Sequence, residues 1–192
     1  FVKLGAKGLV IGALNEYKRI DIDFMKSFMN EFAALEITFH KAFDDVENPF
    51  DALDTLYDLK VKRILTSGCK PTALEGKHFI KQLIEKNKIQ ILVAGGVNEI
   101  NALEIIEYTG ATEIHAGLKI TDVSGSSNRI YTTKEKVKAL IDVVKTSWKY
   151  VIKWNGFHFF IRSKKYQMAG EDQCGYPGIE CVVCKEKQYP GL

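Results

Sequence analysis

Short apolar runs alternate with helical patterns along most of this chain, and this alternation restricts the fold more than any other feature. The runs are rich in β-branched residues and recur about every 25 residues, with amphipathic helical spacing between them. Such an uninterrupted series of strand–helix units predicts an α/β fold on a parallel sheet. The five runs are Gly8–Leu14, Ile37–Ala42, Arg63–Thr66, Ile89–Ala94 and Thr112–Ala116.

The segments between these runs carry start and stop signals of helices. Asn48-Pro49 has the residue types preferred at the N-cap and at the first helical position. Two capping boxes, Thr72-x-x-Glu75 and Thr132-x-x-Glu135, predict the starts of the third and fifth helices. The fourth segment has an apolar helical face and a glycine at its end, namely Ile100, Leu103, Ile106 and Gly110.

Polar and apolar residues alternate in two of the strands, which helps to distinguish a barrel from an open sheet. Thr38 and His40, and later Glu113 and His115, alternate with apolar neighbours. An open doubly wound sheet is covered by helices on both faces, so its central strands are apolar on both sides. A barrel is covered only on its outside. We therefore expect an incomplete (β/α)8 barrel of the TIM type, with five parallel strands and outer helices.

Six motifs, in this order and at these spacings, resemble the CutC-type copper homeostasis proteins, and the resemblance covers about residues 1–144. The motifs are Gly5–Leu14, Ile37–Asp44, Arg63–Gly68, Ala73–Gly76, Ala94–Val97 and Gly110–His115. The resemblance implies a (β/α)8 barrel and a role in copper handling with Cu(I) binding. It also implies a cytosolic protein, nuclear too in animals, whose full-length relatives form homo-oligomers. It implies no particular reaction, because the family has no agreed catalytic activity.

Compared with the family pattern, both ends of this chain differ. The first three strands of the family, with their helices, are absent, so we expect a fragment with two exposed sheet edges. Residues 145–192 do not follow the family. They are predicted to form a hairpin about Asn155-Gly156 and then irregular sequence. We interpret this region as an appended or mis-spliced tail, and the alternative is a real second module.

Titratable side chains near strand ends are the first candidates for a functional site. His40 and His115 lie near the ends of their strands, with Asp44 and Glu113 close by in sequence. A histidine beside a carboxylate serves as a general base or as a metal ligand with a second-shell acceptor. The plainer alternative is a hydrogen-bonded network that fills the barrel interior.

Cys69 and a glycine pair provide two further candidates. Cys69 follows a strand, where its thiolate would ligate Cu(I) with help from a nearby helix start, or would simply pack as a small buried thiol. Gly95-Gly96, with Asn98 opening the next helix, is typical of a loop that holds an anion on backbone amides. Lys41 stands where the family has arginine, and we expect it to hold the same anion as a point charge.

Composition excludes several classes of function. The net charge of +3 gives no electrostatic footprint for nucleic acid. No apolar run approaches 18 residues, so no membrane span is expected. The four cysteines form no disulfide framework, which suits a reducing cytosol. Three of them, Cys174, Cys181 and Cys184, form a possible soft-metal group in the tail.

Two functions therefore follow from the sequence. The first is a cytosolic copper-handling protein that binds a copper ion or a small anionic ligand at the barrel mouth, with Cys69, His40 and His115 as candidate metal ligands. The second is a barrel enzyme acting on a phosphorylated or carboxylated small molecule. In that enzyme His40 and Asp44 would be the acid/base groups, while Lys41 and the glycine pair would hold the anion.

Overall fold

The computed structural model of the chain describes residues 6–118, 120–122, 129–147, 150–154, 159–163 and 179–181, with side chains described for 6–118 and 132–145. Its main feature is a curved sheet whose first five strands are parallel and follow one another in chain order. The five predicted strands are therefore confirmed, each somewhat shorter than or equal to its apolar run. They are β1 (Gly8–Ile11), β2 (Glu36–Phe39), β3 (Arg63–Thr66), β4 (Gln90–Val93) and β5 (Glu113–Ala116).

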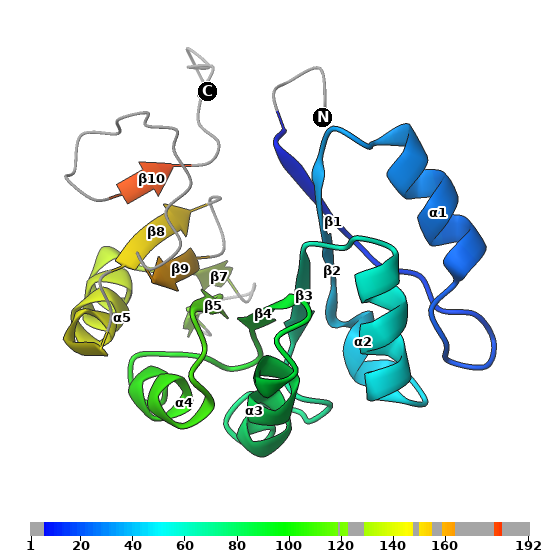
Figure 1. Cartoon of the computed structure of the whole chain (residues 1–192). Helices are drawn as coiled ribbons and strands as arrows, with labels where there is room; N and C mark the ends of the chain where they lie inside the picture. The colour runs from blue at the N-terminus through cyan, green and yellow to red at the C-terminus, as the bar shows by residue number, and fades with distance from the viewer. Residues whose placement is uncertain are drawn as a thin grey trace, which may run out of the picture.

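Helices cover the outer side of this sheet. They follow its curve, and the inner side carries none of them (Figure 1). This arrangement confirms the predicted incomplete barrel. The helices are α1 (Ile22–Glu31), α2 (Pro49–Asp58), α3 (Lys77–Glu85), α4 (Ala102–Thr109) and α5 (Lys134–Ser147). Within the described residues, no helix has both the length and the apolar character that crossing a membrane requires.

The two faces of the sheet have different partners. Outward residues such as Phe39, Ile64 and Ile114 are fully buried in the main core between strands and helices. Inward residues Leu65 and Leu92 belong to a second, much smaller apolar cluster with Ala94. Because side chains alternate along a strand, this division follows directly from the period of two in the sequence.

A charged group spans the inner face at the amino ends of the strands. Arg63 donates from Nε to Glu113 Oε2 at 2.5 Å, and its Nη1 lies 3.6 Å from Glu36 Oε2. Burial alone would lower the pKa of Arg63, but the charges of Glu113 and Glu36 raise it above its ordinary value. Glu113 is only 4% exposed, so its charge is tolerated there because Arg63 pairs with it.

The helix start at Asn48 is confirmed, whereas the two capping boxes are only partly correct. Asn48 Oδ1 accepts from the backbone N–H groups of Phe50 and Asp51, and Pro49 is the first helical residue. Thr72 Oγ1 does accept from Glu75 N, at 3.3 Å, but this closes a turn. α3 itself begins later, at Lys77, with Gly76 as its N-cap.

The predicted fifth start is displaced by one residue. Thr133, not Thr132, accepts at its Oγ1 from a backbone N–H of the first turn, that of Lys136, at 3.3 Å. Thr132 instead donates from Oγ1 to the carbonyl oxygen of Leu118 at 2.8 Å, which ties the entry of α5 to the chain after β5. The sequence contains two adjacent threonines, and the tertiary contact decides which of them caps the helix.

The fourth helix is shorter than predicted at its start and ends where predicted. Ile100 precedes α4 and is 87% exposed, so its assignment to the apolar helix face is wrong. Asn98 forms the turn before α4, accepting from Ile100 N at 2.8 Å, and Asn101 is the N-cap. Gly110 ends the helix with φ +72°, as expected for a left-handed C-cap.

The region after α5 adds strands to the same sheet. β8 (Tyr150–Trp154) and β9 (Phe159–Ser163) pair antiparallel on either side of the predicted turn, and residues 155–158 between them lie outside the described residues. β9 pairs antiparallel with β5, and β10 (Ile179–Cys181) pairs with β8. The expectation that β5 would be an exposed edge is therefore wrong, because the hairpin occupies that edge. A separate two-stranded ribbon joins β6 (Ile120–Asp122) to β7 (Arg129–Tyr131).

Candidate functional site

The candidate site begins where the chain leaves β2. Residues Lys41–Asp45 form a short 3-10 helix, η2, with His40 at its N-cap. His40 Nδ1 accepts from Ala42 N at 3.1 Å, which fixes the imidazole ring over the first turn. A side chain at Gly12, directly after β1, would meet this ring at 2.8 Å, so the glycine provides the space that His40 occupies. The local sequence therefore holds His40, Lys41 and Asp44 on one tight turn.

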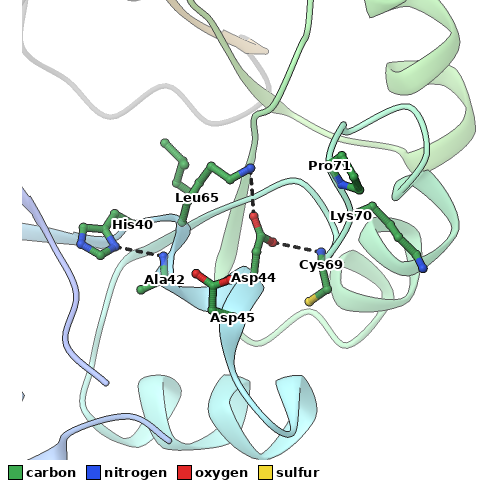
Figure 2. A pocket seen from close by; sticks show the side chains of 9 residues that line it. His40, Ala42, Asp44, Asp45, Leu65, Cys69, Lys70 and Pro71 are labelled. Atoms are coloured by element: carbon green, nitrogen blue, oxygen red, sulfur yellow. Dashed lines mark hydrogen bonds and ion pairs between the residues drawn. The ribbon is translucent and has the colours of Figure 1, made fainter. Parts of the chain in front are cut away.

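An open pocket of about 710 Å³ lies beside η2, at the carboxyl ends of the strands. Figure 2 shows the Asp44 side chain near its centre, with His40 and Cys69 on opposite sides of it. This is the position at which parallel α/β barrels place their ligands. The pocket is lined by His40, Lys41, Ala42, Asp44, Asp45, Leu65, Cys69, Lys70 and Pro71.

Asp44 is the most heavily bonded side chain of the pocket. Its carboxylate accepts from the backbone N–H groups of Ser67 and Cys69, each at 3.0 Å, and from the hydroxyl of Thr66. Burial raises the pKa of Asp44, but these hydrogen bonds lower it more, so the net pKa lies below its ordinary value of 3.8. Asp44 is therefore a carboxylate at neutral pH, and its charge holds the loop after β3.

Lys41 is a second link between η2 and the loop after β3. Its Nζ donates to Ser67 Oγ at 2.8 Å and lies 3.3 Å from Asp44 Oδ2. Ser67 Oγ lies 2.5 Å from the Lys70 carbonyl oxygen and 2.9 Å from Asp44 Oδ2, and its single proton is available to only one of them. The Lys41 side chain remains 45% exposed, so its ammonium group is accessible from the pocket.

Gly95 of the glycine pair lies close to Lys41. A Cβ on Gly95 would stand 2.7 Å from Ser67 Cβ and 3.5 Å from Lys41 Nζ. Gly95 and Gly96 have φ +104° and +70°, so the close approach of the two loops depends on glycine. The Asn98 side chain does not stand apart as a further ligand group, because its amide donates to the Gly96 carbonyl oxygen at 3.0 Å.

Cys69 lies on the pocket wall, but not as a stabilised thiolate. Burial, followed by the charges of Asp44 and Asp45, raises the pKa of the Cys69 thiol to about 11. No helix starts beside it, since α3 begins at Lys77. The expected stabilisation of a Cys69 thiolate is therefore wrong. Cys69 is a protonated thiol at neutral pH, with Sγ 4.0 Å from the Phe43 carbonyl oxygen.

The two histidines and Glu113 lie in different surroundings. In the neutral His40 ring, Nδ1 accepts from Ala42, so the proton is on Nε2, and metal binding there requires the other tautomer and loss of this hydrogen bond. His115 is half-buried on β5, and Glu113 pairs with Arg63 near the amino end of the same strand. Neither lines the pocket that contains His40. Within the part of the chain that the structure describes, no three His, Cys, Asp or Glu side chains form a metal cluster.

Sequence reasoning missed the residues that organise the pocket, Thr66 and Ser67. Both are completely buried, and both bond to Asp44. The available signal was the polar triplet Thr66-Ser67-Gly68 at the end of an apolar strand, where polar groups are typical of a site.

The side chains of the three tail cysteines are not described. Cys174 and Cys184 lie outside the described residues, and for Cys181 only the backbone in β10 is described.

Comparison with known proteins agrees with this geometry. The profile of the CutC family matches residues 1–120, which is more than half of the chain. The chain belongs to the CutC family. A human protein named copper homeostasis protein cutC homolog is 46% identical over 127 residues, covering 65% of this chain and 46% of that protein.

A bacterial relative and a solved structure give the same result. A CutC family protein of Pasteurella multocida is 37% identical over 133 residues, covering 67% of this chain and 54% of its own length. A crystal structure of CutC from Streptococcus agalactiae superposes with a TM-score of 0.54 at 32% identity, covering 57% of this chain and 55% of that chain. This CutC-family chain thus spans about half the length of the relatives that it matches.

Proposed function

We propose that this chain takes part in copper homeostasis, and that it handles Cu(I) at the pocket beside η2. The observation that supports the proposal best is the match of the CutC profile to residues 1–120, which include every residue that lines this pocket, together with 46% identity over 127 residues to a human copper homeostasis protein. The proposed location is the cytosol, and in animals also the nucleus. Copper is here a cargo, not a resident catalytic group.

The chemistry of the pocket predicts weak Cu(I) affinity. Cu(I) prefers two or more soft ligands, and Cys69 is the only thiol that the described pocket provides. Binding must also remove the thiol proton from a group with a pKa of about 11, which reduces the apparent affinity at neutral pH. His40 can add imidazole ligation only if Nδ1 gives up its hydrogen bond from Ala42 N, either to bind the ion itself or to take the proton from Nε2.

Competition titration against a Cu(I) chelator tests this proposal. The full chain is compared with a variant in which Cys174, Cys181 and Cys184 are all serine, and with that variant carrying Cys69→Ser. We expect weak binding in the tail variant and its loss when Cys69 is also replaced. Tight binding that remains in the quadruple variant would show that no thiol of this chain is responsible, and would contradict the proposed pocket.

A second candidate function is the binding of a small carboxylated or phosphorylated molecule, including an enzyme that acts on one. It is favoured by the exposed Lys41 ammonium group, which lies next to the Gly95 loop at the mouth of the sheet. In such an enzyme His40 would be the acid/base group. Asp44 would stay ionised and position Lys41, because its pKa is lowered.

Calorimetric titration with inorganic phosphate and with citrate tests this second candidate. Lys41→Met removes the cation that contacts Ser67, whereas Lys70→Met removes another cation of the same pocket that has no role in joining the loops. We expect Lys41→Met to abolish binding and Lys70→Met to weaken it only slightly. Equal effects of the two substitutions would indicate unspecific charge attraction.

A further inference from the structure

A second cavity of about 590 Å³ adjoins the pocket beside η2. The two cavities share Asp44 and Asp45 in their walls. The second one is otherwise lined by the loop after β1 and by the chain at the end of η2, with the residues Glu16, Tyr17, Lys18, Val46 and Glu47. A ligand that occupies the first pocket therefore has room to extend past Asp45 into the second cavity.

The two ends of η2 carry opposite charges that remain accessible to a ligand. Lys41 is the first residue of η2, and its ammonium group has three N–H donors, of which one donates to Ser67 and one lies near Asp44. Asp45 is the last residue of η2 and is exposed. Among the described residues, no side chain forms an ion pair or a hydrogen bond with the Asp45 carboxylate. One donor of Lys41 and the carboxylate of Asp45 are therefore free to bind a ligand.

The geometry of a 3-10 helix sets how far apart these two groups lie. Such a helix rises about 2.0 Å per residue, so the backbones of Lys41 and Asp45 are about 8 Å apart along its axis. Residues three apart eclipse one another, which places Lys41 over Asp44 and Ala42 over Asp45. The ion pair of 3.3 Å between Lys41 and Asp44 agrees with the first of these stackings. A ligand that reaches both free groups must therefore carry its own charges several bonds apart.

The wall between the two charged groups is mainly apolar. Ala42, Leu65 and Pro71 line it, together with the Cys69 thiol (Figure 2). Burial, and then the charges of Asp44 and Asp45, raise the pKa of this thiol to about 11, so Cys69 is neutral at pH 7. A short methylene chain suits such a wall. A sugar would instead leave hydroxyl groups against apolar side chains, where they find no hydrogen-bond partner.

The charges at the Asp45 end of the site favour a cation. Glu16, Asp45 and Glu47 bring carboxylates to the second cavity, where Lys18 is the only lysine of the lining. Arg19 Nε lies 3.1 Å from Glu47 Oε2 and neutralises that group. Glu16 and Asp45 have no such partner among the described residues. A second carboxylate or a phosphate at this end would meet like charge, whereas an ammonium group would be attracted.

We propose that the site takes an ω-aminocarboxylate, a small molecule with a carboxylate and an ammonium group at opposite ends of a methylene chain. The carboxylate binds the free donor of Lys41, close to Gly95. The chain lies along Ala42 and Leu65, and the ammonium group binds Asp45 at the entrance to the second cavity. This inference rests on the second candidate function, the binding of a small carboxylated molecule, and adds the charged group at the other end of that ligand.

Calorimetric titration with four matched compounds tests the inference. Caproate has the carboxylate alone, hexylamine has the ammonium group alone, norleucine has both on one end, and ε-aminocaproate has them on opposite ends of a chain of the same length. We expect ε-aminocaproate to bind about fivefold more tightly than each of the other three, which is the gain from one partly solvated ion pair. Equal binding of ε-aminocaproate and caproate would overturn this inference and leave the second candidate function intact. Binding of neither would overturn both.

Two neutral substitutions locate the ammonium group. Asp45→Asn should reduce the affinity for ε-aminocaproate to that for caproate, without weakening the binding of caproate itself. Asp58→Asn is the matched control, because Asp58 is an exposed carboxylate at the end of α2 that lines neither cavity. It should leave the affinities for both compounds unchanged. A fivefold preference for ε-aminocaproate that persists in Asp45→Asn would place the ammonium group elsewhere and overturn the inference.

Discussion

Asp44 is the residue on which the geometry of the pocket depends most. Its carboxylate is 9% exposed and joins η2 to the loop after β3 through Thr66, Ser67 and Cys69. Replacement by asparagine keeps the size but puts an amide N–H2 group against donors that need an acceptor. Because buried polar groups left without a partner are costly, we expect Asp44→Asn to lower the free energy of unfolding by about 2–4 kcal/mol.

Urea denaturation measures this loss, and Asp45→Asn is the control. Asp45 lines the same pocket and is exposed, so its replacement should change the free energy of unfolding by less than about 0.5 kcal/mol. If the two variants were equally stable, Asp44 would not be the anchor of this loop.

The lowered pKa of Asp44 also predicts how stability depends on pH. A carboxylate whose folded-state pKa lies below its unfolded value contributes stability that is fully present above the unfolded pKa, near 3.8. This contribution is lost as the pH falls through the folded-state pKa. The free energy of unfolding of the natural chain should therefore fall more steeply below about pH 4 than that of Asp44→Asn. Parallel curves for the two proteins between pH 5 and pH 2.5 would contradict the assignment.

The reactivity of Cys69 gives a further prediction at this scale. With a thiol pKa of about 11, the thiolate is scarce at neutral pH. Because only the thiolate reacts, alkylation by iodoacetamide should be slow at pH 7 and rise about tenfold per pH unit up to about pH 10. The measurement uses a chain with the three tail cysteines replaced by serine. Asp45→Asn removes one of the charges that raise this pKa and should accelerate the reaction.

The position of the candidate pocket was predictable from single residues, but the hydrogen bonds and ion pairs within it were not. His40, Lys41, Asp44 and Cys69 were all identified because each lies at a strand end, and all four line the pocket. Their roles depend on contacts between units far apart in sequence, such as the bond of Asp44 to Ser67 across 23 residues. A pattern along one strand contains no information about such partners. His115 and Glu113 were grouped with them because they share a strand face, although Glu113 pairs with Arg63 near the amino end of that strand.

At the scale of elements, the loop with the glycine pair controls the approach of β3 and β4 at the pocket. Gly95→Ala adds a methyl group 2.7 Å from Ser67 Cβ at φ +104°, so both the contact and the backbone are strained. Gly110→Ala is the matched control, because Gly110 has φ +72° and open space around its Cα. We expect Gly110→Ala to lower the free energy of unfolding by about 1 kcal/mol, and Gly95→Ala to lower it by at least about 2 kcal/mol more, as measured by urea denaturation. Equal losses would mean that the loops are free to move apart.

Element types were predictable, whereas element boundaries were decided by tertiary contacts. Asn48-Pro49 specified a start correctly, because an N-cap and a first-turn proline act within four residues. Thr132 and Thr133 are equivalent as local signals, and the bond from Thr132 to Leu118 O selects Thr133 as the cap. The Thr72 box failed for a related reason. The chain there is held by the bond from Ala73 N to the Gly95 carbonyl, and α3 begins only after it.

For the whole molecule, one sheet joins strands that the CutC profile covers to strands that lie beyond it. The five parallel strands and helices α1 to α4 lie within the match to the CutC profile, which ends at residue 120. The division into a partial barrel at 1–144 and a tail at 145–192 remains a prediction. The hairpin of the tail nevertheless continues the sheet, with Ile114 of β5 aligned to Ile161 of β9.

This pairing leads to a prediction about the solution behaviour of the chain. Removal of the residues after Ser147 takes away β8, β9 and β10 and leaves the edge of β5 without its partner, in addition to the open edge of β1. Because unpaired edges are templates for association, we expect the truncated chain to self-associate at micromolar concentration, and to a greater extent than the full chain at the same concentration. Sedimentation velocity of both chains over a concentration series provides the measurement.

Ile161→Pro in the full chain is a second variant. It removes the backbone donor of the residue aligned with Ile114 and Ile152 without shortening the protein, and it should produce the same association. A truncated chain that stays monomeric with a cooperative melting transition would show that the hairpin contributes nothing to the protection of this edge.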